Sequence, residues 1–206
     1  MRRYKYKGGG THLLWWTVGA IAYGLGTGLE ASITLLGNSP ELTKAWYIAG
    51  ALLGGYPLAQ GTVYLLLKRK TANILTAVTI PIIVILSILV WLSPVNLAAM
   101  IPHKPGGAIL GWQWIRIFTP IINGYASVYL IGGAIFSAWR FAKRRAPAVH
   151  VIGNSLIALG ALLPGIGGGM AKAGIVEALY IGEFMGIIII WIGYWYRVKP
   201  APRPTT

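Results

Sequence analysis

All four acidic residues of this chain are glutamates, and two of them lie deep inside long apolar segments. Glu30 lies six residues before the end of segment 13–36, about 9 Å inside at a helical rise of 1.5 Å per residue. Glu183 lies eight residues into segment 175–196, about 12 Å from its start by the same rise. Ionisable groups are costly within a membrane and usually serve a function there. Both carboxyls are therefore candidates for carrying a proton or binding a cation.

A basic residue close to these acids offers a structural alternative. Arg116 directly precedes the fourth apolar segment, and Glu177 stands near the start of the sixth. In one interpretation Arg116 pairs with Glu30 or Glu177 and locks three helices together, because a buried charge requires a partner. In the other, one carboxyl has no fixed cation, and we expect this free carboxyl to be the deeper one, Glu183. The two interpretations are compatible.

Two uncharged polar residues extend the predicted proton, ion or substrate site. Gln60 follows Pro57 by three residues in the second apolar segment, and Asn123 lies in the fourth. Together with Glu30 and Glu183 they form the set of polar groups that we expect at membrane depth.

Proline and glycine indicate where the helices that carry these groups are interrupted. Pro57 and Pro81 fall near the middle of the second and third segments, where each removes a hydrogen bond and should kink its helix. Pro164 begins a glycine-rich run that includes Gly165 and Gly167, so the outer third of the fifth segment is expected to be unwound. Irregular backbone at membrane depth persists only where protein or a wet cavity surrounds it.

Six long apolar segments must position these residues. They are 13–36, 45–67, 73–92, 117–138, 150–168 and 175–196. Hydrophobic residues make up 56% of the chain and charged residues 11%, which is outside the usual range of soluble domains. About 20 apolar residues are needed for a helix to cross the hydrocarbon layer. The sequence predicts an all-α polytopic integral membrane protein: one domain over 1–206, a six-transmembrane-helix bundle with an outer loop at 93–114.

Basic residues predict the orientation of this bundle. Fourteen of the eighteen lie on one side: Arg2, Arg3, Lys5, Lys7, Lys68, Arg69, Lys70, Arg140, Lys143, Arg144, Arg145, Arg197, Lys199 and Arg203. The other four are Lys44, Lys104, Arg116 and Lys172. Because basic residues remain in the cytoplasm during insertion, both termini are predicted there, in a prokaryotic-type plasma (inner) membrane.

These topology signals also account for the net charge of +14. The positive charge is divided among four edges, whereas nucleic-acid binding needs one clustered basic face, so no nucleic-acid partner is expected. The lipid bilayer is the expected partner, with unspecific attraction to anionic headgroups.

Internal similarity offers two interpretations of the helix arrangement. Residues 48–57 (IAGALLGGYP) and 157–168 (IALGALLPGIGG) share a Gly-Ala-Leu-Leu run and a nearby proline. Paired interrupted helices of this kind are typical of inverted three-plus-three repeats in transporters. The alternative is a chance match in a very apolar chain.

Small residues form stripes that favour close helix contact. The clearest is Ala20, Gly24, Gly28 and Ser32 in the first segment, with further pairs at Gly50 and Gly54 and at Gly182 and Gly186. They indicate tight packing within the bundle or, alternatively, the face of a homodimer.

The composition excludes several chemistries. The chain has no Cys and no Asp, so thiol catalysis, disulfides and aspartyl proteolysis are excluded. His12, His103 and His150 lack the companions that a zinc or haem site requires, so no metal or cofactor is expected. No serine lies in a nucleophile-elbow motif, and no glycine-rich loop with a lysine is present to bind phosphate.

Three classes of function remain. The favoured one is a small transporter or permease-like protein that moves a small solute or ion between kinked helices 2 and 5 and the acids of helices 1 and 6. The second is a non-catalytic subunit or assembly factor of a larger membrane complex. The third, an intramembrane lipid-modifying enzyme, is the least favoured because no catalytic motif is present.

Overall fold

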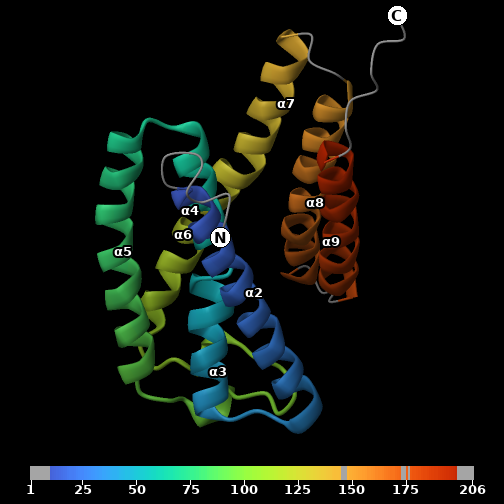
Figure 1. The fold of residues 1–206 in the computed structure, drawn as a ribbon. Coiled ribbons are helices and arrows are strands. Elements are labelled where there is room, and N and C mark those ends of the chain that lie inside the picture. The colour runs from blue at the N-terminus through green and yellow to red at the C-terminus, as the bar shows by residue number, and fades with distance from the viewer. Residues whose placement is uncertain (1–9, 145–147, 173–174, 176, 199–206) are drawn as a thin grey trace, which may run out of the picture. The chain divides into compact units, whose positions relative to one another are not determined.

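The computed structural model describes residues 10–144, 148–172, 175 and 177–198 (Figure 1). All regular elements in these residues are helices, and β-type pairing is confined to two isolated bridges, Val95 with Leu110 and Ile101 with Lys104. The predicted all-α class is therefore confirmed for the described part of the chain. Contacts divide the chain into two compact units, Met1–Ser127 (unit 1) and Val128–Thr206 (unit 2), where the sequence predicts one domain.

Unit 1 contains five α-helices and one π-helical segment among its described residues. They are α2 (Thr11–Leu36), α3 (Pro40–Trp46), η1 (Tyr47–Leu52, the π-helical segment), α4 (Tyr56–Leu66), α5 (Arg69–Leu92) and α6 (Phe118–Ser127). The start of α3 is specified locally, because Ser39 Oγ accepts a hydrogen bond from Leu42 N at 3.2 Å and Pro40 occupies the first turn. α2 packs along α3, η1 and α4.

The segment predicted as one helix over 45–67 is interrupted in its middle. Leu53 N still donates to Ile48 O at 3.0 Å and Gly54 N to Gly50 O at 3.1 Å, but residues 53–55 lie outside any helix. Pro57 then sits in the first turn of α4, where its missing N–H costs nothing. The structure thus contains a break a few residues before Pro57 where the sequence predicts a kink.

The other two prolines lie inside helices. α5 continues through Pro81, and α8 (Ala148–Lys172) continues through Pro164, Gly165 and Gly167. The predicted unwinding of the fifth segment is therefore not found within the described residues. Segments 48–57 and 157–168, which resemble each other in sequence, differ in local structure.

The connection after α5 is structured. It contains three short 3-10 helices, η2 (Leu97–Ala99), η3 (Gly107–Ile109) and η4 (Gln113–Ile117). Asn38 joins this connection to the α2–α3 turn, since its Nδ2 donates to Ile101 O at 3.0 Å and to Lys104 O at 3.2 Å. The α2–α3 turn and the 93–117 connection therefore lie at the same end of unit 1 (Figure 1).

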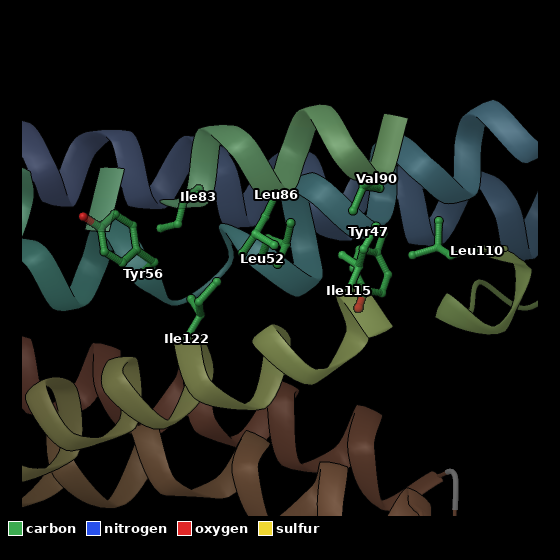
Figure 2. Close-up of a cluster of buried hydrophobic side chains, with 9 residues drawn as sticks. All are labelled: Tyr47, Leu52, Tyr56, Ile83, Leu86, Val90, Leu110, Ile115 and Ile122. Carbon is green, nitrogen blue, oxygen red and sulfur yellow. The ribbon is translucent and has the colours of Figure 1, made fainter. Parts of the chain in front are cut away.

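A buried apolar cluster holds unit 1 together. Its nine members are Tyr47, Leu52, Tyr56, Ile83, Leu86, Val90, Leu110, Ile115 and Ile122. Figure 2 shows that the cluster extends from Tyr56 at one end to Leu110 at the other, with contributions from η1, α4, α5 and α6. The 93–117 connection is thus part of the core.

Unit 2 contains η5 (Val128–Gly132, a π-helical segment), α7 (Gly133–Lys143), α8 (Ala148–Lys172) and α9 (Glu177–Val198). The α8–α9 contact is unusually close. A Cβ added to Gly160 would lie 2.7 Å from Gly186 O, and one added to Gly186 would lie 2.6 Å from Gly160 O. Glycine on both helices is what permits the two backbones to approach this closely.

Two helical stretches in the described residues, Arg69–Leu92 and Gln113–Lys143, are long and apolar enough to cross a membrane. Two of the other predicted spans fall short of this criterion for separate reasons. The second segment is divided by its break, and the Gly, Thr, Trp and Tyr residues of α2 lower its mean hydropathy. α8 and α9 are 25 and 22 residues long and contain the apolar stretches Val151–Pro164 and Tyr180–Tyr196.

Candidate functional site

Gln60 lies at the centre of a buried polar network in unit 1. The α4 helix carries this side chain, which is completely inaccessible to solvent. Its Nε2 donates to Thr76 Oγ1 at 2.6 Å and, more weakly, to Ala72 O at 3.4 Å. Its Oε1 accepts from the Tyr125 hydroxyl at 2.6 Å. One amide therefore joins α4 to both α5 and α6.

The network forms a ladder between α4 and α5. Tyr56, Gln60 and Tyr64 are spaced by four residues, so they share one face of α4. Each meets a polar partner on α5: the Tyr56 hydroxyl lies 2.5 Å from Thr79 Oγ1, and Tyr64 OH donates to Asn73 Oδ1 at 2.9 Å.

The hydrogen bonds of Gln60 and of Tyr64 are connected through Thr76. Thr76 Oγ1 accepts from Gln60, and its single proton can go to Ala72 O at 2.9 Å or to Tyr64 OH at 3.1 Å. Asn73, which binds Tyr64 at the end of this series of hydrogen bonds, is exposed. A continuous series of hydrogen bonds therefore leads from the buried amide to the surface of unit 1.

The break in the second helix lies next to this ladder. Asn123 Nδ2 donates to Ala51 O at 3.4 Å, at the end of η1, where helix termini leave carbonyls without helical partners. A Cβ added to Gly55 would lie 3.1 Å from Ala126 Cβ, so α6 packs directly against the interruption. The ring of Tyr56 lies 6.0 Å from that of Tyr125. Side chains of α4 and α6 therefore take part both in the hydrogen bonds around Gln60 and in the packing around the break.

The chemistry that this arrangement offers is neutral hydrogen bonding. An amide and several hydroxyls can donate and accept, but the ladder contains no carboxylate, imidazole or amine. Three of the four hydrogen-bonding positions of Gln60 are occupied by protein groups. Such a site suits recognition of an uncharged polar molecule or of water rather than acid–base catalysis.

Comparison with protein-family models, with curated proteins and with solved structures finds no match to this chain. Its function must therefore be argued from its own residues.

Arg116 and Glu30, one of the two predicted acid–base pairs, have other partners in the structure. Glu30 is half-buried, and its Oε2 accepts from Trp46 Nε1 at 3.2 Å. Arg116 is exposed, and its Nη1 donates to Gln113 Oε1 at 2.7 Å. The side chain of Glu177 lies outside the described part of the chain. Glu30 is therefore held by a neutral indole of α3.

Glu183 belongs to unit 2. Its side chain is half-buried on α9 and interacts with another group. It lies between Gly182 and Gly186, both of which contact α8.

Of the four predicted polar residues, Asn123 reaches the break in the second helix through its bond to Ala51 O, and Gln60 lies on α4, five residues after the break. Glu30 contacts α3, and Glu183 belongs to unit 2. In the described residues, no three His, Cys, Asp or Glu side chains lie close enough together to hold a metal ion.

Sequence reasoning missed the other members of the Gln60 network. They are Thr76 and Tyr125, which bind Gln60 directly, and Tyr64 and Asn73, which follow Thr76 in the series. The signal that could have found them is the periodicity of polar residues in two apolar segments. Tyr56, Gln60 and Tyr64 recur every four residues, while Asn73, Thr76 and Thr79 recur every three, as expected for one face of each helix.

Proposed function

We propose that the chain is a multi-pass protein of the plasma membrane, with six spans and both termini in the cytoplasm. The distribution of basic residues supports this, since fourteen of eighteen lie on the side assigned to the cytoplasm. Large apolar side chains that face outward from the helices also support it. Examples on α5 are Ile74, Val78, Ile85, Ile88 and Leu92, and examples on α9 are Ile181, Phe184, Ile187 and Trp191.

Within this framework, the favoured function is permease-like transport of a small solute. The observation that carries it is the completely buried Gln60, which lies just after the break in the second segment and is hydrogen-bonded to α5 and α6. Discontinuous helices at the middle of the membrane commonly form the substrate sites of transporters. Because the ladder is uncharged, an uncharged polar solute fits it best.

The acidic residues have an accessory role in this proposal. Glu30 and Glu183 are carboxyls at membrane depth in the six-span arrangement, and such groups commonly couple transport to protons or cations. Their present contacts, Trp46 for Glu30 and a neighbouring group for Glu183, would then change during the transport cycle.

Solute flux into proteoliposomes tests the proposal. Purified protein is reconstituted, and swelling is followed by light scattering with urea, glycerol and erythritol as probes. Wild-type vesicles should swell faster than protein-free vesicles with at least one probe. Gln60→Leu, which removes the amide but keeps its approximate volume, should lower that rate at least tenfold, equivalent to about 1.4 kcal/mol. Glu183→Gln should lower it if this carboxyl provides coupling.

The chain offers a matched control. Gln113 is the other glutamine, lies outside the ladder and is exposed, so Gln113→Leu makes the same chemical change elsewhere. It should leave flux within about twofold of wild type, because its hydrogen bonds, to Ala108 O, Leu110 O and Arg116, lie within the 93–117 connection and its edge and not in the ladder. Absence of flux with all three probes, or wild-type flux in folded Gln60→Leu, would contradict the transport proposal.

A second function is favoured by a separate observation on α2. A Cβ added to Gly24 or Gly28 would meet no atom within 4 Å, although small residues at this spacing normally permit close helix contact. This face suits a non-catalytic subunit or assembly factor that contacts another membrane protein. Recovery of a stoichiometric partner in mild detergent would favour this function over transport.

A further inference from the structure

Unit 2 contains an open apolar groove between α7 and α8. Its volume is about 440 Å³, within the roughly 300–1,000 Å³ typical of small-molecule sites. Ile135, Trp139 and Ala142 line it from α7, and Val151, Ser155 and Leu162 line it from α8. On α8 the lining runs from Val151 to Leu162, which are eleven residues apart, or about 16 Å at 1.5 Å per residue. The groove is therefore elongated.

One end of this groove is basic. Arg140, Lys143 and Arg144 are exposed in the last turns of α7, and Lys143 Nζ lies 5.2 Å from the centre of the Trp139 ring. The ammonium group is thus held beside a residue that lines the groove.

The start of α8 adds to the positive potential at this end. α8 begins at Ala148, three residues before Val151, which lines the groove, and its first turn contains no acidic residue. Helix N-termini attract negative charge. The opposite end, near Ile135 and Leu162, is apolar.

We propose that this groove binds one anionic phospholipid of the surrounding bilayer. An acyl chain lies along the apolar wall towards Leu162, and the phosphate lies at the basic end beside Lys143. The basic end of the groove favours an anionic lipid, because basic sites between membrane helices bind anionic headgroups. Trp139, which is 57% exposed, is suited to the boundary between headgroup and acyl chain. The inference rests on the proposed membrane placement but does not depend on transport.

Lipid binding can be measured by native mass spectrometry of the full chain released from detergent. Dioleoylphosphatidylglycerol is the anionic probe, and dioleoylphosphatidylcholine has the same chains with no net charge. The wild-type protein should retain the first lipid in preference to the second. Lys143→Gln should weaken phosphatidylglycerol binding about fivefold, as expected for one basic group near an anionic surface. It should leave phosphatidylcholine binding nearly unchanged.

Two further variants test the groove itself. Ala142→Phe and Ser155→Phe place a ring in it from opposite walls, and both positions are exposed enough to accept one. Each should lower the binding of both lipids, and the thermal unfolding midpoint identifies a variant that fails to fold. If one of the two variants fails to fold, the other still tests the groove from the opposite wall.

The matched control is Lys70→Gln on α5, which removes an exposed lysine far along the chain from the groove. It should retain the wild-type preference for phosphatidylglycerol. Equal binding of both lipids by the wild type would overturn the proposal, and so would an equal effect of Lys70→Gln and Lys143→Gln, since that indicates unspecific surface attraction. Because the assay measures no flux, these outcomes are independent of the transport proposal.

Discussion

Both the amide nitrogen and the amide oxygen of Gln60 are hydrogen-bonded, so its partners contribute to the stability of unit 1. Burying an amide without hydrogen bonds costs roughly 1–3 kcal/mol, whereas each bond made contributes about 1 kcal/mol. Gln60 makes bonds of 2.6 Å to both Thr76 and Tyr125. The ladder therefore specifies how α4, α5 and α6 pack, in addition to any role in binding a solute.

Removal of one hydroxyl provides a measure of this contribution. Tyr125→Phe leaves the ring in place but deprives Gln60 Oε1 of its donor, so the free energy of unfolding should fall by about 1 kcal/mol. Unfolding in mixed detergent micelles measures the change. Tyr194→Phe is the matched control, since this tyrosine is 61% exposed. If both variants unfold alike, the Tyr125 bond contributes nothing to stability.

At the residue scale, the sequence predicted part of this site. Gln60 and Asn123 are conspicuous because amides are rare in apolar segments. Thr76 and Thr79 are not, because a hydroxyl in a helix can bond the carbonyl four residues earlier, as both do here, and needs no other partner. The contact of Glu30 with Trp46 depends on the packing of α2 beside α3, which no local pattern reveals.

At the scale of elements, the three prolines behave differently because their neighbours differ. The ring of Pro57 opposes a helical carbonyl four residues earlier, and Gly54 and Gly55 immediately before it stabilise a helix poorly. Pro81 follows Val78, Thr79 and Ile80, and α5 continues through it. Pro164 lies on α8, whose glycines bring it against α9. A proline alone therefore predicts a lost hydrogen bond, and the flanking residues decide whether the helix breaks.

The α8–α9 contact leads to a prediction about one methyl group. In Gly186→Ala the new Cβ would lie 2.6 Å from Gly160 O, a backbone atom that cannot move away cheaply. Overpacking of this kind costs about 1–3 kcal/mol, so the unfolding midpoint should fall. Gly24→Ala is the control, because nothing lies within 4 Å of its Cβ and alanine favours helix. An equally stable Gly186→Ala would show that the helices separate more easily than their glycines indicate.

At the scale of the whole molecule, the number of spans is the question on which the proposals depend. Hydropathy and length identify two candidate stretches in the described residues, Arg69–Leu92 and Gln113–Lys143, whereas the apolar segments and their charges predict six. One reason for the difference is the break before Pro57, which divides the second segment and which the sequence predicted only as a kink.

Contacts inside unit 1 argue against the two-span alternative. Asn38 binds the backbone of Ile101 and Lys104, so the α2–α3 turn meets the connection after α5. With six spans both belong to the outer side. With only two spans, the α2–α3 turn would lie on the same side of the membrane as Lys70, at the start of α5, and opposite the connection it binds.

Cysteine labelling separates these alternatives, and the chain has no Cys of its own to interfere. Cysteines are introduced singly at Glu41, Lys70 and Lys104, all of which are exposed. A membrane-impermeant maleimide applied to intact cells should label positions 41 and 104, whereas position 70 should react only after permeabilisation. If position 41 instead behaves like position 70, the first two segments do not cross the bilayer. Gln60 would then lie outside the membrane, and the transport proposal would be wrong.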